Sequence, residues 1–224
     1  MDNLISYGFQ LVVGALVTLK LAFSVLALGL TSGLLLAWMK TSKMTVVRMP
    51  VDFLTSVTRG IPEFLIILVI YFGLSSFVQR YLGDTLEITP FVGGVIALSI
   101  VFASISSEVF RGALASVPLG QIEAAHAYGV STLKTFVLIR LPQAWRICLP
   151  SINNMWQAVI KDTSLVSVIG LEDMLKKAGI AAQYTRQPML FYCAAAAIYF
   201  LMLTASTPIF KHLEKRASFG YTRS

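Results

Sequence analysis

Four polar side chains recur at helical spacing within an otherwise apolar stretch of the chain. Asn153, Gln157, Lys161 and Ser164 follow one another at intervals of four, four and three residues, so on a helix they form one stripe. Such a stripe inside a membrane faces a path for a polar solute or a subunit interface, or it makes interhelical hydrogen bonds without touching a solute. Asp162 falls on roughly the opposite side of that helix.

Glu108 is the strongest acidic candidate for solute chemistry. It ends an uncharged run that begins at Ile88. Its carboxylate either attracts a cationic solute or forms an ion pair with Arg111 or Lys161. The first role predicts a substrate contact, and the second predicts a structural one.

The chain lacks the motifs of common catalytic and cofactor sites. It has no phosphate-binding loop ending in Gly-Lys-Ser/Thr, no Gly-x-Gly-x-x-Gly and no His-Glu-x-x-His. Its two histidines and two cysteines have no metal-ligand spacing. An embedded enzyme would need convergent acid and base groups, and Lys161 and Asp162 point apart. We therefore expect a chain that is not an enzyme and that holds no cofactor or metal itself.

The composition indicates a bilayer as solvent. Of 224 residues, 56% are hydrophobic and 13% charged, whereas a soluble domain usually carries about 25% charged residues. The net charge of +7 comes from basic residues clustered between apolar blocks. That distribution is typical of loops facing anionic lipid, and it excludes nucleic-acid binding as the reason for the charge.

The apolar blocks predict an all-α integral membrane protein with five transmembrane helices in a single domain covering 1–224. The expected spans are about 16–39, 61–78, 88–108, 150–171 and 188–210, because about 20 residues cross the hydrocarbon. The alternative for 150–171 is a re-entrant or interfacial segment. Gly29 and Gly33, and the pair Gly93-Gly94, are expected to allow close helix packing.

The charged loops predict the orientation. The basic set is Lys40, Lys43, Arg48, Arg59, Arg111, Lys134, Arg140, Arg146, Lys211, Lys215, Arg216 and Arg223. The opposite set is Arg80, Lys176, Lys177 and Arg186, mixed with Asp84, Glu87, Glu172 and Asp173. The richer set should be cytoplasmic, which puts the N-terminus outside, the C-terminus in the cytoplasm, and a cytoplasmic loop at about 109–149.

The cytoplasmic loop contains two helical segments separated by a glycine. Residues 121–128 are rich in helix formers, and Gly129 is a natural C-terminal stop. A second, amphipathic helix follows from Ser131 or Thr132, and Pro142 is expected to end it.

This loop resembles the EAA loop of ATP-binding-cassette (ABC) importer permeases at every defined position. The matching residues are Glu123, Ala124, Ala125, Gly129, Ile139, Leu141 and Pro142. The resemblance implies the MetI-like transmembrane domain of a type I importer. It also implies that the first short helix docks on a separate ATPase subunit and transmits its closure to the spans.

Further segments resemble the polar-amino-acid permeases, including the histidine, arginine, lysine, ornithine and opine types. They are Thr58-Arg59-Gly60-Ile61-Pro62, Glu108-Val-Phe-Arg111-Gly112 and the segment from Lys161 to Ser167. Arg59, Gly60, Pro62 and Arg111 are interpreted as structural, with Arg59 an anchor on the cytoplasmic side; the alternative for Arg59 is a direct contact with the substrate. The alternatives are a permease for another small solute, a secondary transporter or a membrane-embedded enzyme subunit.

The resemblance also implies partners and a location. It implies two ATPase subunits that bind ATP and Mg, a second permease that is identical or homologous, and an extracytoplasmic amino-acid-binding protein. The expected location is the bacterial cytoplasmic membrane, and the expected mechanism is alternating access.

Overall fold

The computed structural model describes residues 2–83 and 87–218, and every regular element within them is a helix. The elements are α1 (Asp2–Lys40), α2 (Thr45–Gly60), α3 (Glu63–Leu82), α4 (Pro90–Ala115), α5 (Leu119–Ala127), α6 (Thr132–Thr135), the π-helical turn η1 (Phe136–Arg140), α7 (Leu141–Asp162), the 3-10 helix η2 (Thr163–Ile169), α8 (Met174–Thr185) and α9 (Pro188–Ala217). Asp84 and Arg223, used above in the charge comparison, lie outside the described residues.

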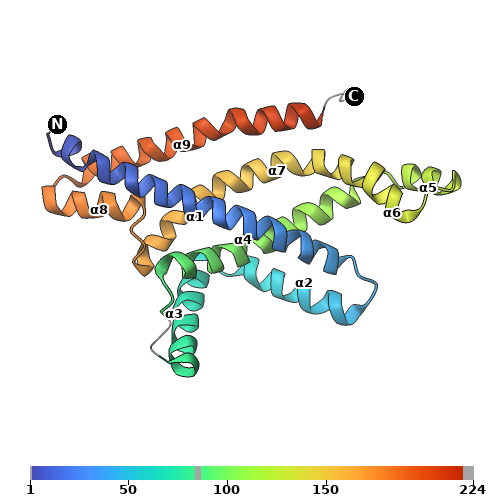
Figure 1. The fold of residues 1–224 in the computed structure, drawn as a ribbon, viewed down its shortest axis with the longest axis horizontal. Coiled ribbons are helices and arrows are strands. Elements are labelled where there is room, and N and C mark those ends of the chain that lie inside the picture. The colour runs from blue at the N-terminus through green and yellow to red at the C-terminus, as the bar shows by residue number, and fades with distance from the viewer. Residues whose placement is uncertain (1, 84–86, 219–224) are drawn as a thin grey trace.

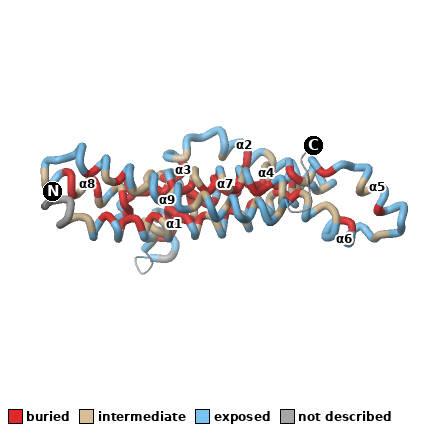
Figure 2. The backbone as a smooth tube through the Cα atoms, turned by 90° about the horizontal axis from the view of Figure 1, so that it is seen from above, coloured by how far each residue is buried: buried red, intermediate tan, exposed pale blue. Residues whose placement is uncertain are grey.

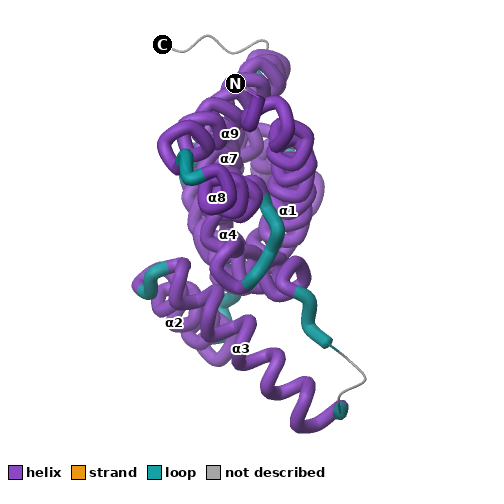
Figure 3. Tube along the Cα trace, turned by 90° about the vertical axis from the view of Figure 1, so that its left-hand side faces the viewer, coloured by secondary structure: helices purple, strands orange, loops and turns teal. Residues whose placement is uncertain are grey.

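Helices α1, α4, α7 and α9 run roughly along the length of the molecule (Figure 1). The short α5 and α6 lie at one end of this bundle, and α8 lies at the opposite end beside the N-terminus. Helix α3 projects away from the bundle, as the end-on view shows (Figure 3). In its most apolar window 11% of the residues are buried, against 61% for α4, so α3 is largely uncovered by its own chain.

Helices α1 and α4 approach closely because glycines of α1 face large or polar side chains of α4. A Cβ atom at Gly29 would lie 2.2 Å from Cδ1 of Phe102, and one at Gly33 would lie 1.8 Å from Oγ of Ser106. The Ser106 hydroxyl also donates to the Gly29 carbonyl oxygen at 3.0 Å. The predicted close packing at these glycines is confirmed.

The apolar core lies where α1, α4 and α7 meet, along the middle of the bundle (Figure 2). Leu21 and Val25 of α1, Phe102 of α4, and Trp156 and Ile160 of α7 are each at most 4% exposed. Lipid tails are as apolar as these side chains, so close packing rather than removal from water holds such helices together.

Within the described residues, four helices are long and apolar enough to cross a membrane: Tyr7–Lys40, Glu63–Tyr81, Pro90–Ala115 and Pro188–Ala217. The count of five is not confirmed, because the expected span at 150–171 is not one regular apolar helix. Hydroxyl groups of Thr163, Ser164 and Ser167 each donate to the carbonyl three residues earlier, and the chain there tightens into η2. Gly170 ends η2 with a φ of 98°.

The expectation that Pro142 ends a helix is wrong. The chain stays helical from Thr132 to Asp162, with η1 directly before the proline. The Leu141 N–H donates to the Phe136 carbonyl, a wider turn than in an α-helix, next to the residue that lacks an N–H. Helices α2 and α8 were also not predicted, because both occupy segments interpreted as loops.

Candidate functional site

The segment that resembles the EAA loop forms a helical hairpin at one end of the molecule. Helix α5 closes with the Gly129 N–H donating to the His126 carbonyl at 2.9 Å and the Val130 N–H donating to the Ala125 carbonyl at 3.0 Å. This pattern needs a left-handed residue, and Gly129 supplies it with a φ of 76°. The predicted glycine stop is therefore confirmed.

Helix α5 is held to the rest of the chain on one narrow side only. Ala125 is its sole buried residue among those described, whereas Glu123 and Ala124 are exposed. Apolar side chains around the hairpin are also exposed, with Tyr128 at 90% and Leu133 at 73%. Ile139 is half-buried, while Leu141 and Pro142 are exposed at the base of the hairpin. An apolar surface of this kind at a protein end is typical of a contact with another protein.

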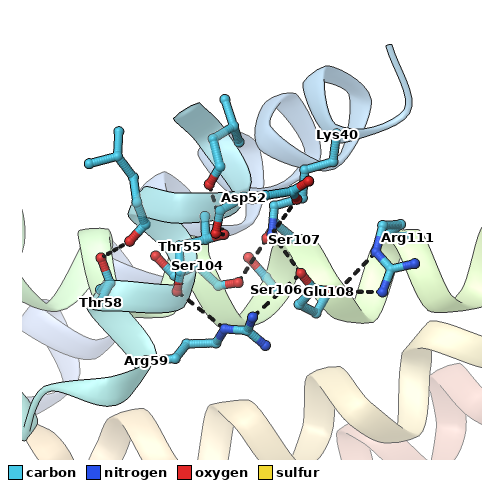
Figure 4. Close-up of polar contacts among 12 residues, drawn as sticks. Lys40, Asp52, Thr55, Thr58, Arg59, Ser104, Ser106, Ser107, Glu108 and Arg111 are labelled. Carbon is cyan, nitrogen blue, oxygen red and sulfur yellow. Dashed lines mark hydrogen bonds and ion pairs between the residues drawn. The ribbon is translucent and has the colours of Figure 1, made fainter. Parts of the chain in front are cut away.

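Glu108 is the centre of an ion-pair network that joins α1, α2 and α4 (Figure 4). The Lys40 ammonium donates to Glu108 Oε1 at 2.6 Å, and the Arg111 guanidinium donates to Oε2 at 2.7 Å. Arg59 lies 3.6 Å from the same carboxylate, and Asp52 lies 3.8 Å from Lys40. Only 1% of the Lys40 side chain is exposed, so its charge depends on these partners.

The network favours the structural role of Glu108 over a substrate contact, because basic side chains of this chain already pair with its carboxylate. The expected pairing with Arg111 is present, whereas Lys161 is not among its ion-pair partners. Lys40, whose partnership was not predicted, is its most buried partner. Gly60 ends α2 and Pro62 immediately precedes α3, so both stand at the bend that carries Arg59 toward Glu108.

A half-open cavity of about 220 Å³ lies between α3, α4 and α7. Its walls are mainly apolar, from Leu98, Val101 and Ile105 of α4 and Met155, Ala158 and Val159 of α7. Three polar side chains also line it: Glu63, Asn154 and Asp162. The carboxyl groups of Glu63 and Asp162 are within hydrogen-bonding contact. Two ionised carboxyl groups at this distance would repel each other, so a cation placed between them would be stabilised by both.

The predicted stripe lies on another side of α7. Gln157 donates to the Asn153 side chain at 3.4 Å, Lys161 is exposed, and Ser164 donates to the Lys161 carbonyl at 2.7 Å. The cavity residues Asn154 and Asp162 are not members of this stripe. The structure thus does not bring Glu108 and the stripe together, and it adds a polar group at Glu63 and Asp162 that the stripe did not include.

At the opposite end, Asp173 begins α8. Its Oδ1 accepts the Lys176 N–H at 2.9 Å, which caps the helix, and the residue is fully buried. Burial raises the pKa of Asp173 to about 6, although backbone N–H groups that bond to the carboxylate oppose the shift. Neighbouring Glu172 is exposed, and its contact with Lys177 lowers its pKa.

Residues 29–219 match the family of binding-protein-dependent transport system inner membrane components. The chain is 38% identical to a histidine/lysine/arginine/ornithine transport system permease protein of Salmonella typhimurium, over 97% of this chain and 98% of the relative. It is 35% identical to an octopine transport system permease protein of Rhizobium radiobacter, over 97% and 94%. A crystal structure of an amino acid ABC transporter with histidines superposes with a TM-score of 0.86 and 30% identity, over 95% and 96%.

Proposed function

The chain belongs to the binding-protein-dependent transport system inner membrane components, a family of multi-pass membrane transport proteins, and from that premise we propose that it imports a cationic polar amino acid. It is a permease subunit of an ABC importer, a transport component rather than an enzyme. The relatives named above are permeases for histidine, lysine, arginine, ornithine and octopine. Those names support a basic amino acid or an opine as the solute.

The observation that carries this substrate class is the carboxyl pair in the cavity. Glu63 and Asp162 touch within largely apolar walls, where a guanidinium or ammonium group would neutralise their repulsion. Asn154 adds an amide that can accept or donate a hydrogen bond. The proposed site therefore binds the positive group of the solute between α3 and α7. The polar stripe of Asn153, Gln157, Lys161 and Ser164 is proposed to face the path or the second permease. Glu108 is proposed to act through its ion pairs with Lys40 and Arg111 rather than by contact with the solute.

Helix α7 together with η2 is proposed as a fifth membrane span. The bundle runs from the α8 end to the hairpin end, and α7 runs along it beside α1, α4 and α9 (Figure 1). The hairpin end carries the basic residues Lys134, Arg140 and Arg146. The preference for basic residues on the cytoplasmic side supports an N-terminus outside and a C-terminus in the cytoplasm.

The exposed α5 is proposed to dock on an ATPase subunit, which binds ATP and Mg. Glu123, Ala124 and Gly129 form this contact, the buried Ala125 couples α5 to the rest of the chain, and Ile139, Leu141 and Pro142 lie at its base. Two ATPase subunits, an extracytoplasmic binding protein and a second permease complete the proposed importer in the bacterial cytoplasmic membrane. The uncovered surface of α3 supports the second permease, because a projecting apolar helix needs a membrane or a partner chain around it.

Transport by the reconstituted importer tests the proposed substrate site. We expect Asp162→Asn and Glu63→Gln each to lower arginine uptake by roughly 10- to 100-fold, because a hydrogen bond to a charged group contributes about 1.5–3 kcal/mol. Glu172→Gln, an exposed acid outside the cavity, is the matched control. Wild-type uptake in both cavity variants, or uptake of neutral amino acids only, would refute the cationic-substrate proposal.

A further inference from the structure

The two arms of the cytoplasmic hairpin are joined by a hydrogen bond between side chains that are not part of the EAA resemblance. Gln143, in the first turn of α7, donates through Nε2 to Oε1 of Gln121 in α5 at 2.6 Å. The same amide donates to the Ile139 carbonyl at 3.0 Å, which fixes its direction. Gln121 lies near the start of α5, whereas the other end of α5 turns at Gly129. The amide pair therefore closes the open end of the hairpin.

Without that bond, α5 would have few attachments. Ala125 is its only buried residue among those described, and the turn at Gly129 has open space around it, since a Cβ atom added there would meet no atom within 4 Å. A hairpin joined only through a glycine can change its angle at low cost, because glycine has the widest range of backbone conformations. The Gln121–Gln143 bond removes that freedom and makes α5 and α7 parts of one unit.

The base of the hairpin is also bonded to α4. Arg140 Nε donates to the Leu114 carbonyl at 3.1 Å, one of the carbonyls left without a helical partner at the end of α4. Helices α4 and α7 supply most of the cavity wall. The hairpin thus bonds directly to both helices that supply most of the cavity wall.

Helix α7 connects the two regions along its length. Asp162 stands at the far end from Gln143, roughly 28 Å away at about 1.5 Å per residue. Pro150 removes one backbone hydrogen bond, but the helix continues past it, with Cys148, Leu149 and Ile152 buried against neighbouring helices. A displacement at the Gln143 end therefore reaches Asp162 through one continuous helix.

We propose that Gln121 and Gln143 are positioning residues that transmit the movement of α5 to the substrate cavity through α7. The proposal rests on the docking of α5 to an ATPase that was proposed above. It predicts that losing the amide pair separates ATPase movement from cavity movement while α5 stays docked.

The experiment uses the complete importer with Cys148 and Cys193 replaced by serine. Ala158→Cys reports on the cavity through its rate of labelling by a thiol reagent with and without ATP, and Ala124→Cys reports on docking by crosslinking to the ATPase. We expect Gln121→Leu and Gln143→Leu each to reduce the ATP-dependent change in labelling by about two- to tenfold, the effect of one neutral hydrogen bond. The Ala124→Cys crosslink should remain.

Rescue separates transmission from a general structural role. Gln121→Glu combined with Gln143→Lys restores an interhelical bond, so the response to ATP should return. Gln10→Ala is the matched control, because Gln10 is an exposed glutamine near the N-terminal end of α1. This variant should leave both readouts unchanged. An unchanged labelling response in both leucine variants, or its loss together with the crosslink, would overturn the proposal. If the parent protein shows the crosslink but no labelling change with ATP, alternating access itself fails, and this inference fails with it.

Discussion

The burial of Lys40 in the Glu108 network predicts how much the free energy of unfolding should fall when Glu108 is replaced. Glu108→Gln removes the carboxylate that lies 2.6 Å from the Lys40 ammonium, a side chain with only 1% exposure. Removing one partner of a buried pair costs about 3–5 kcal/mol, because the other charge is left without compensation. Asp52 still lies 3.8 Å from Lys40 but is half-exposed, so we expect the lower end, about 3 kcal/mol. For a chain of this size that loss lowers the midpoint of thermal unfolding by roughly 6–12 °C.

The controls change two partners of Glu108 in the same network, the exposed Arg111 and the buried Lys40. Arg111→Gln removes a partner whose side chain is 48% exposed, so it should cost less than about 1 kcal/mol. Lys40→Met removes the buried charge itself and leaves Glu108 bonded to Arg111, so its cost should fall between the other two. Thermal unfolding of the purified variants in detergent measures all three. A Glu108→Gln midpoint equal to that of the parent, or an Arg111→Gln loss as large as that of Glu108→Gln, would refute the argument from burial.

Three further predictions concern other parts of the chain. Gly129→Val should lower the amount of solute taken up per ATP about fivefold or more, and Gly129→Asn should lower it much less. The position requires a positive φ, which asparagine adopts more readily than valine, and it has open space for either side chain. Equal effects of the two variants in a reconstituted transport assay would contradict this. Asp173 has a folded pKa above its ordinary value, so its contribution to the free energy of unfolding should fall by about 3 kcal/mol as pH rises from about 3 to 7. Asp173→Asn keeps the cap but should lose that slope in unfolding midpoints measured across pH, and parallel curves would argue against the shift. Gly33→Ala should destabilise the α1–α4 contact by about 1–3 kcal/mol, with partial recovery when Ser106→Ala removes the nearest atom; a neutral effect on thermal unfolding would count against the packing described.

Sequence reasoning succeeded where the determinants are local. The hairpin is determined by a short stretch, since α5 begins near the predicted residue and Gly129 adopts the left-handed conformation that its position required. The close contacts at Gly29 and Gly33 also follow from residue size alone. Local hydroxyl bonds were missed, however, and they convert the end of the expected fourth span into η2.

The parts that were missed depend on residues far apart in sequence. Lys40 and Glu108 are separated by 68 positions, and no local pattern indicates that they meet. Asp162 was correctly placed away from the polar stripe, but that face meets Glu63 of α3, which no helical periodicity of α7 can reveal. Only the packing of α3 against α4 and against η2, which directly follows Asp162, brings the two carboxyl groups together.

The docking of α5 on an ATPase is the central claim, and crosslinking tests it most directly. In the complete importer, Ala124→Cys places a thiol on the exposed side of α5, whereas Tyr184→Cys places one on α8 at the opposite end of the molecule. The account predicts that Ala124→Cys captures the ATPase subunit, that ATP changes the yield, and that Tyr184→Cys captures none. Capture of the ATPase from Tyr184→Cys, with none from Ala124→Cys, would contradict it.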